Sequence, residues 1–122
     1  MSNDSRRLVL VVDDDLDIAD SIGDVLRSGG HEVRLVSTGA EAVAVAAEAR
    51  VGLVLLDWRL PDEPAGAALV RRLRDACGYP VPVVVLSADP LSLAEAREAA
   101  VSDYLPKPFE IADLMHLVDS FC

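Results

Sequence analysis

The feature of this sequence that most constrains its fold is a regular alternation of short apolar, β-branched runs with segments of helical periodicity. The runs are Leu8–Val12, Val33–Val36, Leu53–Leu56, Val81–Leu86 and a weaker one around Tyr104–Leu105. Each is followed by a stretch long enough to form one helix. Alternation of this kind predicts an α/β domain built on a parallel sheet.

The character of the runs predicts their order in the sheet. The run at Val33–Val36 belongs to an alternating apolar and polar pattern, and Tyr104–Leu105 is followed by Pro106, so both are expected at edges. The other three runs are apolar on both faces, which suits strands covered by helices on both sides. We therefore expect a doubly wound five-stranded parallel sheet of order 2-1-3-4-5, with function outside the carboxyl ends of its strands.

The segments between the runs carry helical patterns and helix-ending signals. Gly29-Gly30 and Gly78 mark two helix ends. Apolar residues recur at helical spacing, and the expected helices are centred on Ile18–Leu26, Thr38–Glu48, Leu69–Leu73, Ser92–Ala100 and Ile111–Phe121.

Composition excludes several classes of protein. The net charge of −10 and pI near 4.4 argue against direct nucleic-acid binding by the general surface. The apolar runs are too short to span a membrane and the N-terminus is polar, so we expect no membrane association and a cytoplasmic location. Cys77 and Cys122 form no disulfide framework or metal-ligand spacing. The 122 residues suit a single domain, residues 1–122.

Polar side chains stand where the predicted strands end. Asp13 and Asp14 follow the first run, Asp57 the third, Ser87 the fourth and Lys107 the fifth. Because the carboxyl ends of parallel strands meet at the same edge of the sheet, these residues are expected to converge.

The acidic residues of this set favour a metal ion. Clustered carboxylates raise each other's pKa values unless a cation lies between them. The carboxyl groups of Asp13, Asp14 and Asp57, with backbone oxygen and water, suit a hard divalent ion, and we expect Mg²⁺. The alternative is a set of solvated turn or capping residues. We assign that role to Asp15 and Asp17, because acidic side chains favour a helix N-terminus.

Lys107 is the only lysine in a chain with ten arginines. Its compact ammonium group can bridge a carboxylate and a phosphoryl oxygen, whereas the planar guanidinium group of arginine is shaped differently. The hydroxyl of Ser87 can donate to an incoming anion. A solvated surface lysine and a serine bonded to the backbone are the alternatives. The Lys107–Pro108 peptide bond is a candidate for the cis isomer.

The strings VVDDD, LVLLDWRLPD, VVVLSAD and DYLPKPF, in this order, resemble the signature segments of the response-regulator receiver domain of two-component signalling. The resemblance covers essentially the whole chain and implies a flavodoxin-like receiver fold. It implies that Asp57 accepts a phosphoryl group from a sensor histidine kinase or a histidine phosphotransfer protein. Mg²⁺ would be held by Asp13, Asp14, Asp57 and the backbone carbonyl of Arg59.

The resemblance also implies a switch. Ser87 and Lys107 would bind phosphoryl oxygens, and Ser87 would move toward the phosphoryl group, leaving space for Tyr104. The altered surface would be that of the fourth helix, fifth strand and fifth helix, for a downstream output protein or domain; homodimerisation through this face stays open. The domain would catalyse only its own phosphorylation and slow dephosphorylation, so it would not be an enzyme acting on an outside metabolite.

Some positions around the acceptor carry further expectations. Pro61 matches the family's loop proline, but the turn that follows, residues 62–66, is one residue longer than usual. Arg59 and Asp89 are expected to pair across the mouth of the site and tune the phosphoryl lifetime. Trp58 either reports Mg²⁺ or phosphoryl binding by fluorescence or serves only in loop packing.

Two other functions remain open at this point. A receiver-like binding module would work without phosphate through constitutive contacts of its helical face, although the complete set of site residues argues against it. A metal-dependent phosphohydrolase would use Asp57 as its nucleophile. Such enzymes often carry a second acid two residues later, where this chain has Arg59.

Overall fold

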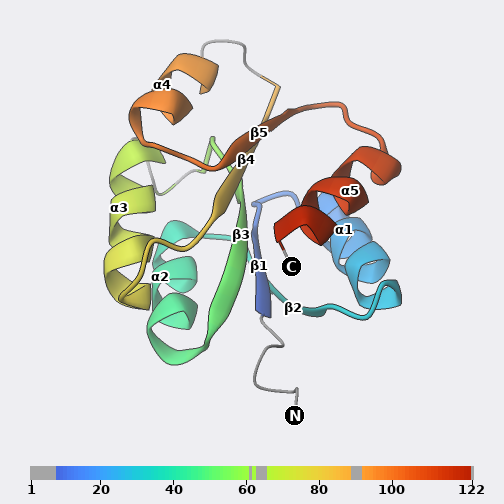
Figure 1. Ribbon diagram of the computed structural model, residues 1–122, viewed down its shortest axis with the longest axis horizontal. Helices are drawn as coiled ribbons and strands as arrows, with labels where there is room; N and C mark the ends of the chain where they lie inside the picture. The colour runs from blue at the N-terminus through green and yellow to red at the C-terminus, as the bar shows by residue number, and fades with distance from the viewer. Residues whose placement is uncertain (1–7, 61, 63–65, 89–91, 122) are drawn as a thin grey trace.

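Five parallel strands form one sheet in the order β2-β1-β3-β4-β5, which confirms the predicted doubly wound topology (Figure 1). The structure is a computed structural model and describes residues 8–60, 62, 66–88 and 92–121. The strands are β1 (Leu8–Val12), β2 (Glu32–Val36), β3 (Val51–Asp57), β4 (Val83–Ser87) and β5 (Asp103–Pro106).

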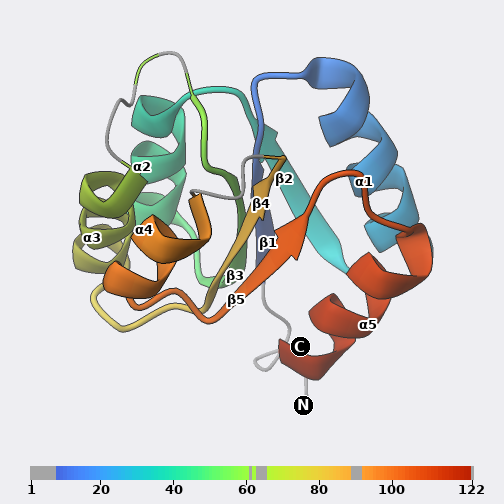
Figure 2. The ribbon, with the colours of Figure 1, turned by 90° about the horizontal axis from the view of Figure 1, so that it is seen from above.

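Helices cover both faces of the sheet. Figures 1 and 2 show α1 and α5 on one face and α2, α3 and α4 on the other. The helices are α1 (Leu16–Ser28), α2 (Gly39–Glu48), α3 (Gly66–Cys77), α4 (Ser92–Glu98) and α5 (Ile111–Phe121).

The alternation of side chains along each strand divides the interior into two apolar cores. Val9 and Val11 of β1 belong to the core beneath α1 and α5, whereas Leu10 and Val12 belong to the core beneath α2, α3 and α4. All five residues of β1 are buried, whereas Val33 is the only buried residue of β2. The expected distinction between central and edge strands is therefore confirmed.

Local sequence signals explain where α1 and α2 begin. Asp15 caps α1 by accepting hydrogen bonds from the backbone N–H groups of Asp17 and Ile18. Thr38 caps α2 through the backbone N–H of Glu41. Such side-chain acceptors satisfy donors that have no partner within the helix.

Helix α4 ends earlier than its sequence pattern predicts. The helix stops at Glu98, because Ala100 takes a left-handed conformation with φ of 57° and the N–H of Val101 bonds back to the carbonyl of Ala96. This return of the chain closes the helix and directs it into β5.

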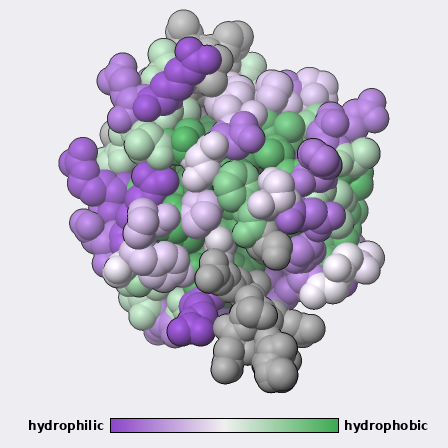
Figure 3. Space-filling view, in the orientation of Figure 1, coloured by the Kyte–Doolittle hydropathy of each residue, from purple (hydrophilic) through white to green (hydrophobic). Residues whose placement is uncertain are grey.

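One face of the molecule can be seen in the space-filling view. The face seen in Figure 3 carries hydrophilic side chains over much of its area, with smaller hydrophobic areas between them. None of the helices in the described part of the chain is long and apolar enough to cross a membrane.

Candidate functional site

The predicted site residues come together at the carboxyl edge of the central strands. Val12 pairs with Leu56 in the sheet, so Asp13 and Asp57 follow neighbouring strands at the same level. Ser87 is the last residue of β4 and pairs with Pro106 of β5, directly before Lys107. The parallel register therefore delivers residues from four strands to one place.

Three carboxylates form the centre of this site. One carboxylate oxygen from each of Asp13, Asp14 and Asp57 lies within 4.8 Å of the other two. Asp13 is fully buried and Asp14 is exposed, so the cluster reaches from the interior to solvent. An oxygen of Asp13 also accepts the backbone N–H of Asp15 at 2.9 Å, which orients the carboxylate.

Lys107 places a positive charge against this cluster. Its ammonium nitrogen lies 3.2 Å from an oxygen of Asp13 and 3.6 Å from an oxygen of Asp57. The Lys107–Pro108 peptide bond is cis, as expected from the sequence. The only lysine of the chain is thus a member of the site, and the reading of Lys107 as a solvated surface residue is wrong.

The environment of Asp57 changes its acidity. Burial raises the pKa of Asp57 to about 6, and the neighbouring Asp13 carboxylate adds to the increase. The backbone N–H of Arg59, which donates to Asp57 at 3.1 Å, and the ammonium of Lys107 lower that pKa. The carboxylate is therefore ionised at neutral pH but holds its proton more tightly than an aspartate in water.

The donor set fits Mg²⁺. Opposite ligands of an octahedral magnesium ion lie about 4.2 Å apart, because each Mg–O bond is about 2.1 Å long. Adjacent ligands lie about 3.0 Å apart. The three carboxylate oxygens lie within 4.8 Å of one another, so they would have to move closer together to bind one ion directly. Three carboxylates against one ammonium also leave excess negative charge, which a dication would compensate. Hard oxygen donors of this kind suit Mg²⁺ better than zinc.

An open cavity exposes this centre to solvent. Its lining residues are Asp14, Asp57, Arg59, Ser87, Ala88 and Lys107. Ser87 is buried at 3% exposure, whereas Ala88 and Arg59 are exposed. A small anion entering the cavity would therefore meet the carboxylates of Asp14 and Asp57, the ammonium group of Lys107 and the hydroxyl of Ser87.

Tyr104 lies on β5, level with Val85, which is two residues before the cavity-lining Ser87 on β4. It pairs with Val85, and Ser87 follows Val85 by two residues, so both side chains belong to the face covered by α2, α3 and α4. Tyr104 is half-buried and packs against the core on that face. The expected positions of Pro61 and Asp89 lie outside the described residues.

Two contacts at the site were not expected from the sequence. The carboxylate of Asp62 accepts the backbone N–H groups of Gly39 at 3.0 Å and Ala40 at 3.3 Å, so it caps α2 from the loop that follows β3. The indole N–H of Trp58 donates to Glu95 of α4 at 3.4 Å. Both join segments far apart in the chain, and local sequence patterns carry no signal for them.

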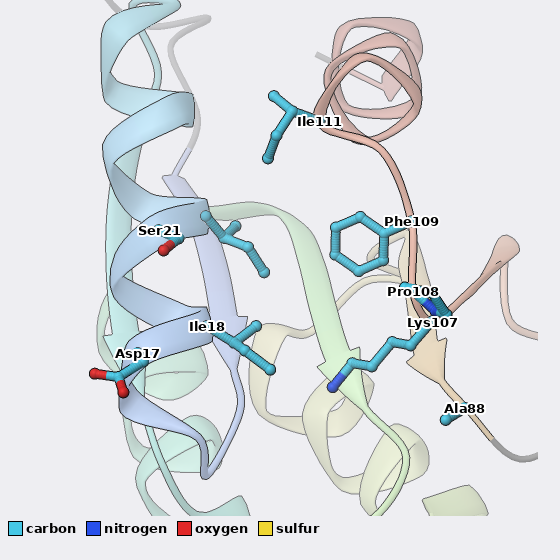
Figure 4. A pocket seen from close by; sticks show the side chains of 9 residues that line it. Asp17, Ile18, Ser21, Ala88, Lys107, Pro108, Phe109 and Ile111 are labelled. Carbon is cyan, nitrogen blue, oxygen red and sulfur yellow. The ribbon is translucent and has the colours of Figure 1, made fainter.

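A second cavity, of about 540 Å³, adjoins the site on the other side of Lys107 (Figure 4). Figure 4 shows Ile18 of α1 and Phe109 pointing into it from opposite walls. Apolar side chains form most of its lining. The lining residues are Asp17, Ile18, Ser21, Ile22, Ala88, Lys107, Pro108, Phe109 and Ile111.

Comparison with known proteins identifies what this chain is similar to. Residues 9–119 match the family model described as the response regulator receiver domain. The chain is 34% identical over 110 residues to the DNA-binding response regulator MtrA of Mycobacterium tuberculosis, covering 90% of this chain and 48% of the relative. It is 43% identical over 111 residues to the transcriptional regulatory protein PrrA of Mycobacterium leprae, covering 88% and 46%. The chain thus spans about half the length of these curated relatives.

Solved structures give the same result. The receiver domain of the sensor histidine kinase PA1611 from Pseudomonas aeruginosa superposes with a TM-score of 0.84 at 32% identity, covering 96% of this chain and 98% of that one. That structure carries a magnesium ion coordinated in its active site cleft.

Proposed function

The chain belongs to the family of response regulator receiver domains of two-component signalling, and from that premise we propose that Asp57 accepts a phosphoryl group from a phosphohistidine on a partner protein. The donor would be a sensor histidine kinase or a histidine phosphotransfer protein. One observation carries the proposal: three carboxylates and the only lysine of the chain converge at the rim of the sheet. Residues 1–122 would form one such domain.

Asp57 is the nucleophile of the proposed reaction. One of its oxygens accepts the N–H of Arg59 and the other faces Lys107, so the carboxylate has a fixed orientation. An oxygen of Asp57 attacks phosphorus and forms a P–O bond while the P–N bond to the donor histidine breaks. The histidine nitrogen keeps the electron pair of that bond and takes up a proton, leaving an aspartyl phosphate on Asp57.

The other site residues position charge around the transferred group. Asp13, Asp14, Asp57 and the backbone carbonyl of Arg59 would hold Mg²⁺, which neutralises charge on the phosphoryl oxygens when bound. The ammonium of Lys107 and the hydroxyl of Ser87 bind phosphoryl oxygens from the protein side. Such positioning and charge neutralisation are the main requirements of phosphoryl transfer. The chain therefore promotes its own phosphorylation and slow dephosphorylation.

The new phosphoryl group acts as a switch in this proposal. It adds roughly 1.5 to 2 negative charges and three acceptor oxygens. Ser87 moves toward these oxygens and Tyr104, on the same face of the sheet, enters the vacated space. The surface of α4, β5 and α5 then changes, and a downstream output protein or domain reads that change.

The cavity beside Lys107 offers a docking place for the donor. It shares Ala88 and Lys107 with the cavity that Asp57 lines, its lining is mostly apolar, and Ile111, one of its lining residues, is 46% exposed. Apolar surface next to a reactive centre favours binding of a protein partner. We therefore place the donor protein between α1 and the connection from β5 to α5.

Intact-protein mass spectrometry tests the central proposal. Incubation with Mg²⁺ and acetyl phosphate should add one phosphoryl group to the wild type and none to Asp57→Asn. Asp75→Asn, an exposed aspartate of α3, is the matched control and should be modified like the wild type. An unmodified wild type, or a modified Asp57→Asn protein, would contradict the proposal.

A further inference from the structure

Trp58, the residue after the proposed acceptor, is held between three elements. Its backbone N–H donates to the carbonyl of Leu86 in β4 at 3.1 Å. The residue is 7% exposed, and its ring lies against Gly66 at the start of α3, where an added Cβ would come within 2.6 Å of the indole. The position of the ring is therefore tightly linked to the end of β3.

The polar atom of this ring points to a fourth element. The indole N–H of Trp58 donates to the carboxylate of Glu95 at 3.4 Å. No buried side-chain nitrogen or oxygen lacks a partner in the described part of the chain, and Glu95 is the partner of this one. A buried N–H without an acceptor is costly, so movement of the ring and movement of Glu95 are coupled.

The described side chains of helix α4 bury little apolar surface. Among its described side chains, residues 94–98, Ala96 alone is buried. A single buried methyl group contributes little to holding a helix in place. Hydrogen bonds from neighbouring elements therefore add to the attachment of residues 94–98.

The C-terminal end of α4 is held by Arg74 of α3. The guanidinium group of Arg74 donates to the carbonyls of Ala99 at 3.3 Å and Ala100 at 3.1 Å, and also to Val81 at 3.2 Å before β4. These bonds involve backbone atoms just beyond the helix. The C-terminal end of α4 is thus fixed to α3, while Glu95 connects its middle to Trp58.

We propose that Trp58 is a positioning residue that couples the state of Asp57 to α4 through Glu95, with the Arg74 contacts as the fixed end of the moving helix. This inference rests on the proposed function, because it needs a phosphoryl group on Asp57. It adds a second connection to the switch surface besides Ser87 and Tyr104. A change at the end of β3 displaces the ring, and the helix follows through the indole hydrogen bond.

Hydrogen–deuterium exchange of the α4 amides, with and without Mg²⁺ and acetyl phosphate, tests this connection. In the wild type, phosphorylation should change exchange in residues 94–98 by about fivefold, the lower end of typical allosteric coupling. Glu95→Ala and Trp58→Phe, which remove the acceptor and the donor, should each lose most of that response while Asp57 is still phosphorylated. Glu95→Gln retains an acceptor oxygen and should therefore show the same exchange response as the wild type.

Controls separate this inference from the proposed function. Glu98→Ala changes an exposed acid on the same helix and should respond like the wild type. If Glu95→Ala simply unfolds α4, its exchange is fast in both states, and Trp58→Phe and Glu95→Gln decide the result. A wild type that acquires no phosphoryl group defeats the proposed function. A full response in phosphorylated Trp58→Phe overturns the coupling alone.

Discussion

The ammonium nitrogen of Lys107 lies 3.2 Å from a carboxylate oxygen of Asp13, although the residues are 94 positions apart in the chain. The side chain of Asp13 is fully buried and that of Lys107 is 19% exposed. Removal of one member of such a pair leaves a buried charge without compensation. This contact therefore joins the stability of the fold to the chemistry of the site.

Lys107→Met should destabilise the metal-free domain by about 3 kcal/mol, because Asp13 keeps its buried charge. Saturating Mg²⁺ should reduce that loss, since a dication at the carboxylates replaces the missing ammonium. Urea denaturation with and without Mg²⁺ measures both values. Arg71→Met, an exposed position of α3, is the control and should change stability by less than about 0.5 kcal/mol. Equal losses with and without Mg²⁺ would contradict this account.

Asp57→Asn should stabilise the metal-free domain at neutral pH. The pKa of Asp57 is raised to about 6 in the folded protein, so the folded state binds this proton more tightly than the unfolded chain. The resulting stability is present below about pH 4 and is lost as the pH rises to about 6. The variant should gain on the order of 1 kcal/mol at neutral pH, after allowance for solvent screening.

Thermal unfolding of wild type and Asp57→Asn across this pH range, without metal, provides the measurement. The two proteins should have similar stability near pH 4 and should differ most above pH 6. Each of these pH values is accurate to about one unit. Asp75→Asn should follow the wild type throughout. A wild type that becomes more stable relative to Asp57→Asn as the pH rises would show that the sign is wrong.

Gly66→Ala should destabilise the protein, although alanine normally favours a helix over glycine. A Cβ at Gly66 would lie 2.6 to 2.8 Å from three atoms of the rigid Trp58 ring. The overpacking should cost about 1 to 3 kcal/mol. Gly23→Ala in α1 is the matched comparison, because the nearest atoms there are the flexible tip of Leu35 at 3.2 Å. Guanidinium denaturation should rank Gly66→Ala well below Gly23→Ala, and the reverse order would count against this packing.

Asp62→Asn should make the stability of the domain less sensitive to acidification. The backbone N–H of Gly39, and then that of Ala40, hold the pKa of Asp62 below its usual value. Stability from this interaction is present above the ordinary aspartate pKa and is lost as the pH falls through the lowered one. The difference in melting temperature from the wild type should therefore be largest near neutral pH and disappear in strong acid. Asp24→Asn, an exposed position in α1, should show no such convergence.

Ile111→Glu should slow phosphoryl transfer from a histidine-phosphorylated protein donor without changing modification by acetyl phosphate. The small donor needs only the open site, whereas a protein donor would contact the apolar cavity beside Lys107. A new acid at the start of α5 also suits the helix N-terminus, so the fold should tolerate it. Ala44→Glu, an exposed position on α2, is the control and should leave both reactions unchanged. Equal slowing with both donors would argue against docking at this cavity.

The fold and the centre of the site were predictable because they follow from periodic patterns. Three strands apolar on both faces require cover on both sides, and their carboxyl ends must then share one rim. Asp13, Asp57 and Lys107 stand directly where such runs stop, so the topology alone brings them together. The role of each residue in phosphoryl transfer stays a prediction until it is measured.

Contacts between distant segments were not predictable in the same way. The bond between Trp58 and Glu95 depends on how α4 sits over the sheet, which no local pattern determines. The cap that Asp62 supplies to α2 depends equally on the path of a loop. The end of α4 at Glu98 differs from the pattern because a left-handed residue, Ala100, redirects the chain.

The site joins Asp13, which follows the first strand, to Lys107, which follows the last strand, and this has a consequence for the order of synthesis. Asp13 is synthesised early, whereas Lys107 follows the last strand, so a chain made only as far as β4 lacks the ammonium that contacts Asp13 in the complete fold. Partial products would carry clustered carboxylates without an ammonium beside them. The proposed phosphoryl-accepting site is therefore complete only once β5 and Lys107 have joined the sheet.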